Sequence, residues 1–194
     1  MSILLVSLGI NFNMKNKFVH PAEYECISGK KYCLKHLYSR DFIYNDSIEN
    51  KEYRCKIYYS DHVYTKGVKA HQLRSVYDEY KLINIEETRT FKEYRFFSST
   101  RYNLSLSLND LLDKCYNNEI RIYQESNNKY VAFPFIKSDT PKKHYGIYLS
   151  FKKSNDNNAI LIHTAYIETD LNKINKRLKN RKIKFLTILR KFGI

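Results

Sequence analysis

The sequence predicts an α+β fold: a helix packed on a four-stranded antiparallel sheet, preceded by an N-terminal β-rich extension and followed by a basic C-terminal helix. Two observations predict it. Apolar residues at helical spacing occupy residues 101–116, and four segments with strand character follow them. Because the links between these segments are short and rich in turn-forming residues, the strands are expected to form an antiparallel meander. A helix beside such a sheet is typical of the α+β class.

Residues 1–85 are expected to form the N-terminal β-rich region. The apolar opening, MSILLVSLGINF, is expected to be its first strand. A turn at Gly29, which can adopt a positive φ, predicts a hairpin within residues 23–36. Residues 51–65 alternate apolar and polar side chains, which predicts a half-buried strand, and residues 87–97 are expected to form another.

The middle of the chain, residues 86–168, is expected to hold the helix and the sheet. The helical spacing is carried by Leu104, Leu108, Leu111, Leu112 and Cys115, with Ser98 to Thr100 as N-caps. The four strands are expected at residues 119–124, 129–136, 144–153 and 159–168.

Alternation assigns faces to this sheet. In the third strand, the apolar face that should pack on the helix consists of Tyr145, Ile147, Leu149 and Phe151. The opposite face carries Arg, Tyr, Ser and Lys side chains. In the last strand, either His163 or the pair Thr164 and Tyr166 must join the polar face, and alternation leaves both assignments open.

Residues 169–194 are expected to form the basic C-terminal helix, capped by Thr169 or Asp170. Nine lysines and arginines in this segment face one acid, and the whole chain carries a formal net charge of +14. We therefore expect a polyanionic partner, and RNA is the first candidate among the polyanions. Two alternatives stay open: a solvated amphipathic helix, and basicity that reflects the codon usage of an AT-rich genome. The three segments are expected to form one compact unit.

Motifs for nucleotide-triphosphate chemistry are missing. The chain has no Walker loop, GxGxxG turn, GxSxG elbow or HExxH helix. Zinc could be held by His20, Cys26, Cys33 and His36, but only Cys33 and His36 have the close spacing of structural zinc sites. We expect no metal and no cofactor, and cysteines packed as small apolar residues.

The opening segment is apolar but lacks a basic leader and a small-residue cleavage site, and it is too short to span a bilayer. We therefore expect a cytoplasmic protein with reduced cysteines and no membrane contact. Met14 is an alternative start of the chain.

Metal-free cleavage of RNA fits these constraints. RNA supplies its own nucleophile, the 2′-OH, so cleavage needs a base, an acid and cations that stabilise the phosphorane charge. The candidate catalytic residues are His62, Arg101, His163, Thr164 and Tyr166. The candidate RNA contacts are Arg95, Arg121, Tyr148, Lys152, Lys176, Arg177, Lys179 and Arg181. Taken singly, such residues are more often surface or hydrogen-bonded structural residues.

The order of elements, with RYNLSLSLNDLL followed by ILIHTAYI, resembles the barnase, EndoU, colicin D and RelE group of small ribonucleases over residues 95–167. The segments YSDHVYT, RYNLS and TAY are also similar to uncharacterised proteins of prophages and mobile elements. The positions that match there are His62, Thr65, Arg101, Tyr102, Ser105, Thr164 and Tyr166. The N-terminal stretch to about residue 80 has no counterpart in minimal RelE-like toxins.

The ribonuclease resemblance implies a metal-independent endoribonuclease toxin restrained by an acidic antitoxin. Catalytic residues vary within this group, so the resemblance transfers no individual role. The competing hypothesis is a non-enzymatic module that binds nucleic acid or a protein through the basic helix and the tyrosine-rich sheet. A third is a structural or host-interaction protein.

Overall fold

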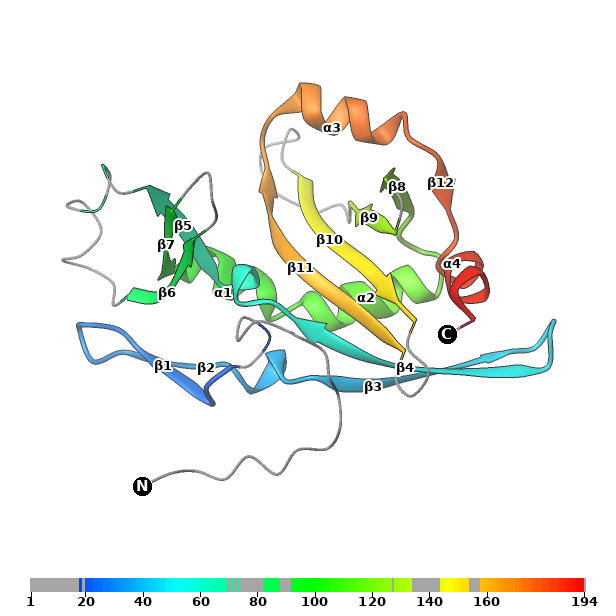
Figure 1. Cartoon of the computed structure of the whole chain (residues 1–194), viewed down its shortest axis with the longest axis horizontal. Coiled ribbons are helices and arrows are strands. Elements are labelled where there is room, and N and C mark those ends of the chain that lie inside the picture. The colour runs from blue at the N-terminus through cyan, green and yellow to red at the C-terminus, as the bar shows by residue number, and fades with distance from the viewer. Residues whose placement is uncertain are drawn as a thin grey trace.

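The computed structural model describes residues 18, 20–69, 71, 73, 82–87, 92–126, 128–133, 144–153 and 158–193. Its centre is a seven-stranded mixed sheet (Figure 1). In order across the sheet, the strands are β12 (Lys182–Ile183), β8 (Ile122–Ser126), β9 (Lys129–Ala132), β10 (His144–Lys152), β11 (Ala159–Glu168), β4 (Lys51–Tyr59) and β3 (Arg40–Asp46). Neighbouring strands are antiparallel, except for the parallel pair β11 and β4.

The predicted fold class, a helix on a four-stranded antiparallel sheet, is therefore wrong. The predicted meander is present as β8 to β11, but strands from both ends of the chain extend it. β4 pairs with β11 from Ala159–Lys56 to Ile162–Tyr59, and β12 pairs with β8. These pairings satisfy backbone groups that edge strands would leave open. Alternation shows which face of a strand is buried but not which strand lies beside it.

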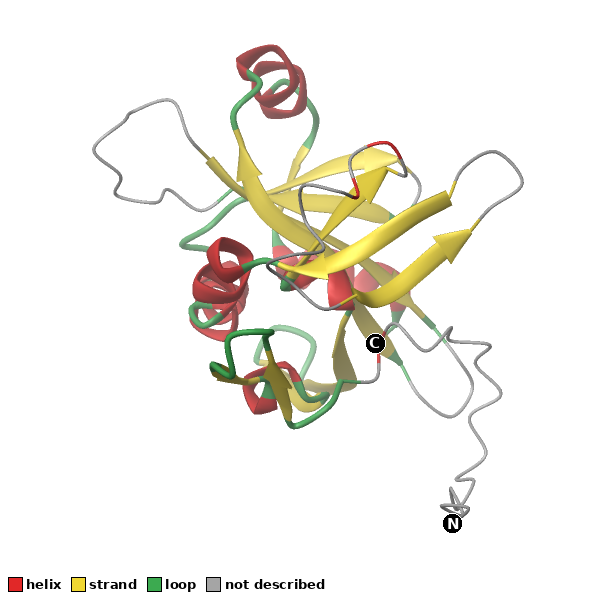
Figure 2. Ribbon diagram, turned by 90° about the vertical axis from the view of Figure 1, so that its left-hand side faces the viewer, coloured by secondary structure: helices red, strands yellow, loops and turns green. Residues whose placement is uncertain are grey.

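Two smaller sheets come from the N-terminal half. The predicted hairpin is confirmed as β1 (Glu23–Glu25) and β2 (Lys31–Cys33), with Gly29 at φ +79. A three-stranded antiparallel sheet has the order β5 (Thr65–Lys69), β7 (Lys92–Phe97) and β6 (Leu82–Glu87). Figure 2 brings this sheet toward the viewer. The predicted strand at residues 1–12, and residues 88–91 of the one at 87–97, lie outside the described residues.

The predicted helix over residues 101–116 is two helices, α1 (Ser99–Ser105) and α2 (Leu108–Tyr116). Serine hydroxyls explain the break, because Ser105 Oγ donates to the carbonyl of Tyr102 and Ser107 Oγ to that of Leu104. Such bonds compete with the helical backbone. The predicted N-cap is confirmed, since Ser98 accepts from the backbone N–H of Arg101.

The C-terminal segment differs from the predicted single helix. It forms α3 (Leu171–Leu178), β12 and α4 (Phe185–Phe192), and Asp170 caps α3 as predicted. Residues 179–184 include four cations close together, Lys179, Arg181, Lys182 and Lys184, which disfavours a continuous helix. They gain backbone bonds to β8 instead, including Gln124 N–H to the carbonyl of Arg181 at 3.1 Å.

The core lies on one face of the large sheet. The apolar face predicted for β10 is confirmed, because Tyr145, Ile147, Leu149 and Phe151 are all buried there. α2 lies behind β10 and β11 in Figure 1. The helices contribute Leu108, Leu112, Cys115, Phe185, Ile188 and Leu189 to the same buried cluster. The opposite face of the sheet carries the polar side chains and is the candidate site.

Candidate functional site

A β-bulge in β11 decides which of its side chains share a face with β10. Tyr148 pairs with Thr164, but the next residue of β10, Leu149, pairs with Ile162. His163 is therefore the extra residue of the bulge, and the alternation shifts by one position across it.

The bulge places both predicted alternatives on the polar face. His163 Nε2 lies 2.6 Å from Oγ of Ser150, on the face of β10 that also carries Tyr148. Thr164 pairs with Tyr148, and Tyr166 stacks on it, so both lie on that face as well. We call this face, with His163, Thr164, Tyr166, Tyr148 and Ser150, the polar sheet face. A regular strand would have exposed only one of the two sets.

Two arginines and two tyrosines form a continuous stack across this face. The rings of Tyr148 and Tyr166 lie 5.3 Å apart and 10° from parallel. The guanidinium of Arg101 lies 5.3 Å from the ring centroid of Tyr166, and that of Arg177 lies 5.0 Å from that of Tyr148. Because the inner ring faces contact each other, the arginines cover the outer ones. The stack joins α1 to α3 through two strands and uses both offset stacking and cation–π attraction.

Glu168, at the end of β11, bonds one tyrosine and one arginine of the stack. Its carboxylate is 6% exposed and accepts from the hydroxyl of Tyr166 at 3.3 Å and from Nη1 of Arg177 at 3.1 Å. It also accepts from the backbone N–H of Asp170 at 3.1 Å. Arg177 makes a second ion pair with Glu125 of β8. The predicted RNA contact Arg177 is thus held by two carboxylates, and its charge is compensated within the protein.

His62 approaches this face through its main chain. It lies in the 3-10 turn η3 (Asp61–Val63), and its carbonyl accepts from Nη1 of Arg101 at 2.9 Å and from Oγ1 of Thr164 at 3.5 Å. Its Nε2 lies 3.8 Å from Oδ1 of the buried Asp61. Four of the five candidate catalytic residues are thus linked by contacts: Arg101 and Thr164 both bond the His62 carbonyl, and Arg101 also lies over Tyr166. His163 is adjacent to Thr164 in β11.

Arg101 is the least compensated cation of this cluster. No carboxylate of the described residues forms a salt bridge with it. Burial lowers the pKa of Arg101, and the nearby charge of Arg95 lowers it further, while Tyr166 and Glu93 act in the opposite direction. A half-buried guanidinium of this kind is suited to the stabilisation of an anion.

Arg95, which we predicted to contact RNA, lies in the core. It is 4% exposed, donates to the carbonyl and Oγ1 of Thr65 at 3.1 Å, and pairs with Glu93 at 2.7 Å. This position argues against direct contact with RNA. Thr65 is one of the positions that match the prophage and mobile-element proteins, and in this structure its role is structural. Ser105 is another, because its hydroxyl lies 2.8 Å from Nε2 of His36.

The C-terminal elements carry a row of exposed cations, which we call the basic surface. It consists of Lys176, Lys179, Arg181, Lys182, Lys184 and Lys191 on α3, β12, α4 and the links between them. None of the six forms a salt bridge with a described carboxylate, whereas Arg190 of the same segment pairs with Asp46. Three predicted RNA contacts, Lys176, Lys179 and Arg181, lie on this surface, and a fourth, Lys152, is exposed at the end of β10.

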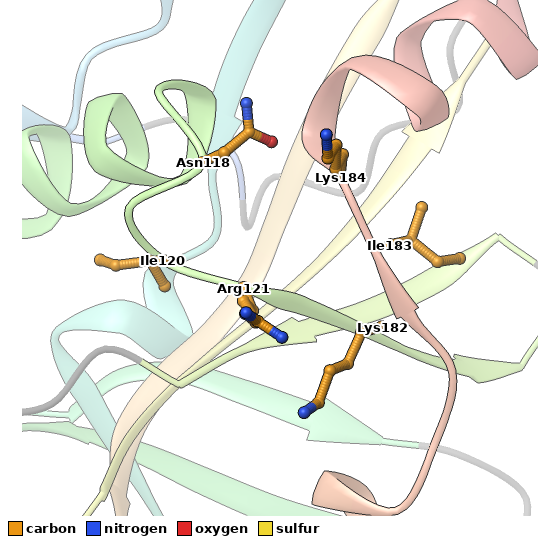
Figure 3. A pocket seen from close by; sticks show the side chains of 6 residues that line it. All are labelled: Asn118, Ile120, Arg121, Lys182, Ile183 and Lys184. Atoms are coloured by element: carbon orange, nitrogen blue, oxygen red, sulfur yellow. The ribbon is translucent and has the colours of Figure 1, made fainter.

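A cavity of about 310 Å³ adjoins the basic surface. It is lined by Asn118, Ile120, Arg121, Lys182, Ile183 and Lys184, between the end of α2, the start of β8 and β12 (Figure 3). Lys182 pairs with Tyr123, and Arg121 precedes Tyr123 by two residues, so alternation puts Arg121 and Lys182 on one face of the ladder. Figure 3 shows their side chains extending on that common side.

The cross-strand register connects this cavity to the polar sheet face. One row of paired residues runs across five strands on the polar side: Lys182, Tyr123, Val131, Tyr148 and Thr164. Tyr123 and Val131, in the middle of this row, are buried, so the row relates the two places through the sheet and not through an open surface.

Residues 18–193 match the model of the YjaZ family. The chain belongs to the YjaZ family. The match spans the whole described region, so the polar sheet face, the basic surface and the cavity all lie within it. No curated protein and no solved structure matches the chain. The likeness of this YjaZ family member to small ribonucleases stays a prediction.

Three of the four candidate zinc ligands contact other groups in the fold. His20 Nε2 bonds the carbonyl of Tyr59 at 2.6 Å, His36 bonds Ser105, and Cys26 contacts Ser28 at 3.0 Å. Within the described residues, no group of three or more His, Cys, Asp or Glu side chains could hold a metal ion. In the same part of the chain, no helix has the length and apolar character needed to cross a bilayer.

Sequence reasoning missed Glu168 and Glu125 of this YjaZ family member. A signal for Glu168 was present, because Thr164, Tyr166 and Glu168 alternate on one strand face. The partner of Glu125 could not be found in this way, since its ion pair with Arg177 joins residues 52 positions apart.

Proposed function

We propose that this YjaZ family member binds RNA through the basic surface. The observation that carries the proposal is the row of six exposed cations without an ion pair to a described carboxylate, in a chain of net charge +14. Arginines of the same segment that serve structure, Arg177 and Arg190, are paired with acids. A row of uncompensated cations gains free energy when it neutralises phosphates and releases their counterions.

An acidic protein that competes with RNA, such as an antitoxin, would be expected to cover the same cations.

Metal-independent cleavage of that RNA is a second candidate function. The contacts of Arg101 with the His62 carbonyl and with Tyr166, beside Thr164 and His163, favour it. In this scheme the 2′-oxygen bonds the phosphorus and the bond to the 5′-oxygen breaks. His163 either accepts the proton of the 2′-OH or donates a proton to the leaving 5′-oxygen, and Arg101 stabilises the negative charge of the phosphorane. RNA is preferred over DNA as the ligand because this chemistry requires a 2′-OH.

Charge reversal tests the binding proposal. Fluorescence anisotropy with a labelled single-stranded RNA, repeated at several salt concentrations, should give an affinity that falls as salt rises. Lys176→Glu with Lys179→Glu should weaken binding strongly, whereas Lys35→Glu with Lys66→Glu, an equal charge change at exposed positions outside the basic surface, should weaken it much less. Equal losses in the two variants, or an affinity that does not depend on salt, would refute the proposed surface.

A further inference from the structure

We infer that the cavity beside β12 binds the phosphate monoester of a nucleotide, either free or at the end of an RNA chain. This inference deepens the proposed RNA binding, because it names a chemical group that the basic surface alone does not select. Nothing in the family match assigns a ligand to this place.

The charge of the lining favours a dianion. Arg121, Lys182 and Lys184 contribute three cations to one cavity, and none of them forms a salt bridge with a described carboxylate. Like charges that line one cavity repel one another, and an anion bound in that cavity relieves the repulsion. A phosphodiester carries one negative charge, whereas a monoester carries about 1.5 to 2 at neutral pH, so it compensates the lining better.

The walls of the cavity are fixed before any ligand arrives. On one side, Asn118 adopts a left-handed conformation at φ 61 after α2. Its N–H bonds the carbonyl of Cys115, and the N–H groups of Glu119 and Ile120 both bond that of Lys114. These bonds also occupy carbonyls at the end of α2 that would otherwise repel an anion. On the other side, β12 is held by its ladder to β8.

The size and the apolar part of the lining match a nucleotide rather than a bare ion. A volume of about 310 Å³ lies at the small end of ligand sites, and Ile120 and Ile183 supply apolar surface for a sugar or base. The side chain of Asn118, which also lines the cavity, adds a donor and an acceptor. The terminal phosphate of an RNA chain can enter a cavity that has one opening. An internal phosphate needs two openings, because the chain continues on both sides of it.

The test compares two RNAs of identical sequence, one with a 5′-phosphate and one with a 5′-hydroxyl, in the anisotropy assay. We expect the phosphorylated RNA to bind about tenfold more tightly, because its phosphate accepts charged hydrogen bonds from the lining cations. AMP and adenosine are titrated separately by calorimetry, and AMP should bind while adenosine does not. Arg121→Gln with Lys182→Gln should abolish both preferences, and Arg54→Gln with Lys66→Gln should keep them. Circular dichroism melting confirms that each variant is folded.

The outcomes separate this inference from the proposed function. Salt-dependent binding of both RNAs with equal affinity would overturn the cavity assignment and leave RNA binding intact. Binding of AMP without binding of either RNA would support the cavity, identify a free nucleotide as the source of the phosphate, and overturn the proposed RNA binding. A phosphate preference that survives the Arg121 and Lys182 substitutions would overturn the assignment of these residues.

Discussion

Tyr148 and Tyr166 stack face to face on neighbouring strands, with ring centroids 5.3 Å apart, and an arginine lies over each ring. Both faces of both rings are therefore occupied by protein groups. Stacking of an RNA base on Tyr148 would require displacement of Arg177, which is held by Glu125 and Glu168. The stack thus has a structural role, and RNA would contact this face through its edges and through the adjacent cations.

The first prediction concerns the stability of this stack. Tyr166→Leu should lower the free energy of unfolding by about 2 kcal/mol, because it removes one aromatic pair and one cation–π contact. Urea unfolding followed by circular dichroism measures the loss. Tyr38→Leu, at an exposed residue of the same type, should change stability by less than about 0.5 kcal/mol. Similar losses in the two variants would show that the stack contributes nothing in solution.

Glu168 and Glu125 provide a matched pair, since both bind Arg177 and they differ in burial. Glu168→Gln removes the charge of a buried carboxylate with three hydrogen-bond donors, so we expect a loss of about 2 kcal/mol. Glu125→Gln affects a more exposed pair and should cost about 0.5 kcal/mol. Chemical denaturation at neutral pH compares them, and the reverse order would contradict the role assigned to Glu168.

A pH dependence follows from the pair of Asp46 and Arg190. The Arg190 guanidinium bonds both carboxylate oxygens of Asp46, at 2.7 and 2.8 Å, and lowers the pKa of Asp46 from 3.8 to about 2. A lowered pKa means that the stabilisation is complete above the unfolded-state value and is lost as the pH falls toward 2.

Asp46→Asn should therefore melt at a lower temperature than the unmodified protein at pH 7. The difference should shrink between pH 4 and pH 2, where the carboxylate of the unmodified protein becomes protonated. Asp41→Asn, at an exposed position of the same strand, serves as the control. A difference in melting temperature that is the same at pH 7 and pH 2 would disprove this linkage.

Cleavage is tested by incubation of the protein with total RNA in excess EDTA, followed by analysis of product ends. The second candidate function predicts 2′,3′-cyclic phosphates and activity that survives chelation. His163→Ala and Arg101→Ala should each lower the rate by roughly 10²- to 10⁴-fold. His144→Ala, at the start of β10, should retain activity. His62→Ala removes the imidazole ring but keeps the backbone carbonyl that Arg101 binds, so it tests the ring alone. RNA binding without cleavage would leave the protein as a binding module.

The sequence by itself determined features that depend on near neighbours. Alternation identified the strands of the meander and the buried face of β10, and Gly29, Ser98 and Asp170 marked a turn and two caps. These signals are local because side-chain direction in a strand and capping at a helix end depend on a few adjacent residues. The composition also drew attention to the C-terminal cations, of which Lys176, Lys179 and Arg181 are exposed, and their contact with RNA stays a prediction.

Only the tertiary structure decided which strands are neighbours and which polar groups meet. The parallel pairing of β4 with β11 made the sheet seven-stranded, and pairing with β8 turned part of a predicted helix into β12. The bulge at His163 brought both candidate sets to one face, and burial placed Arg95 in the core. Hydrogen bonds and ion pairs between residues far apart in the chain decided these features, and local periodicity contains no information about such partners.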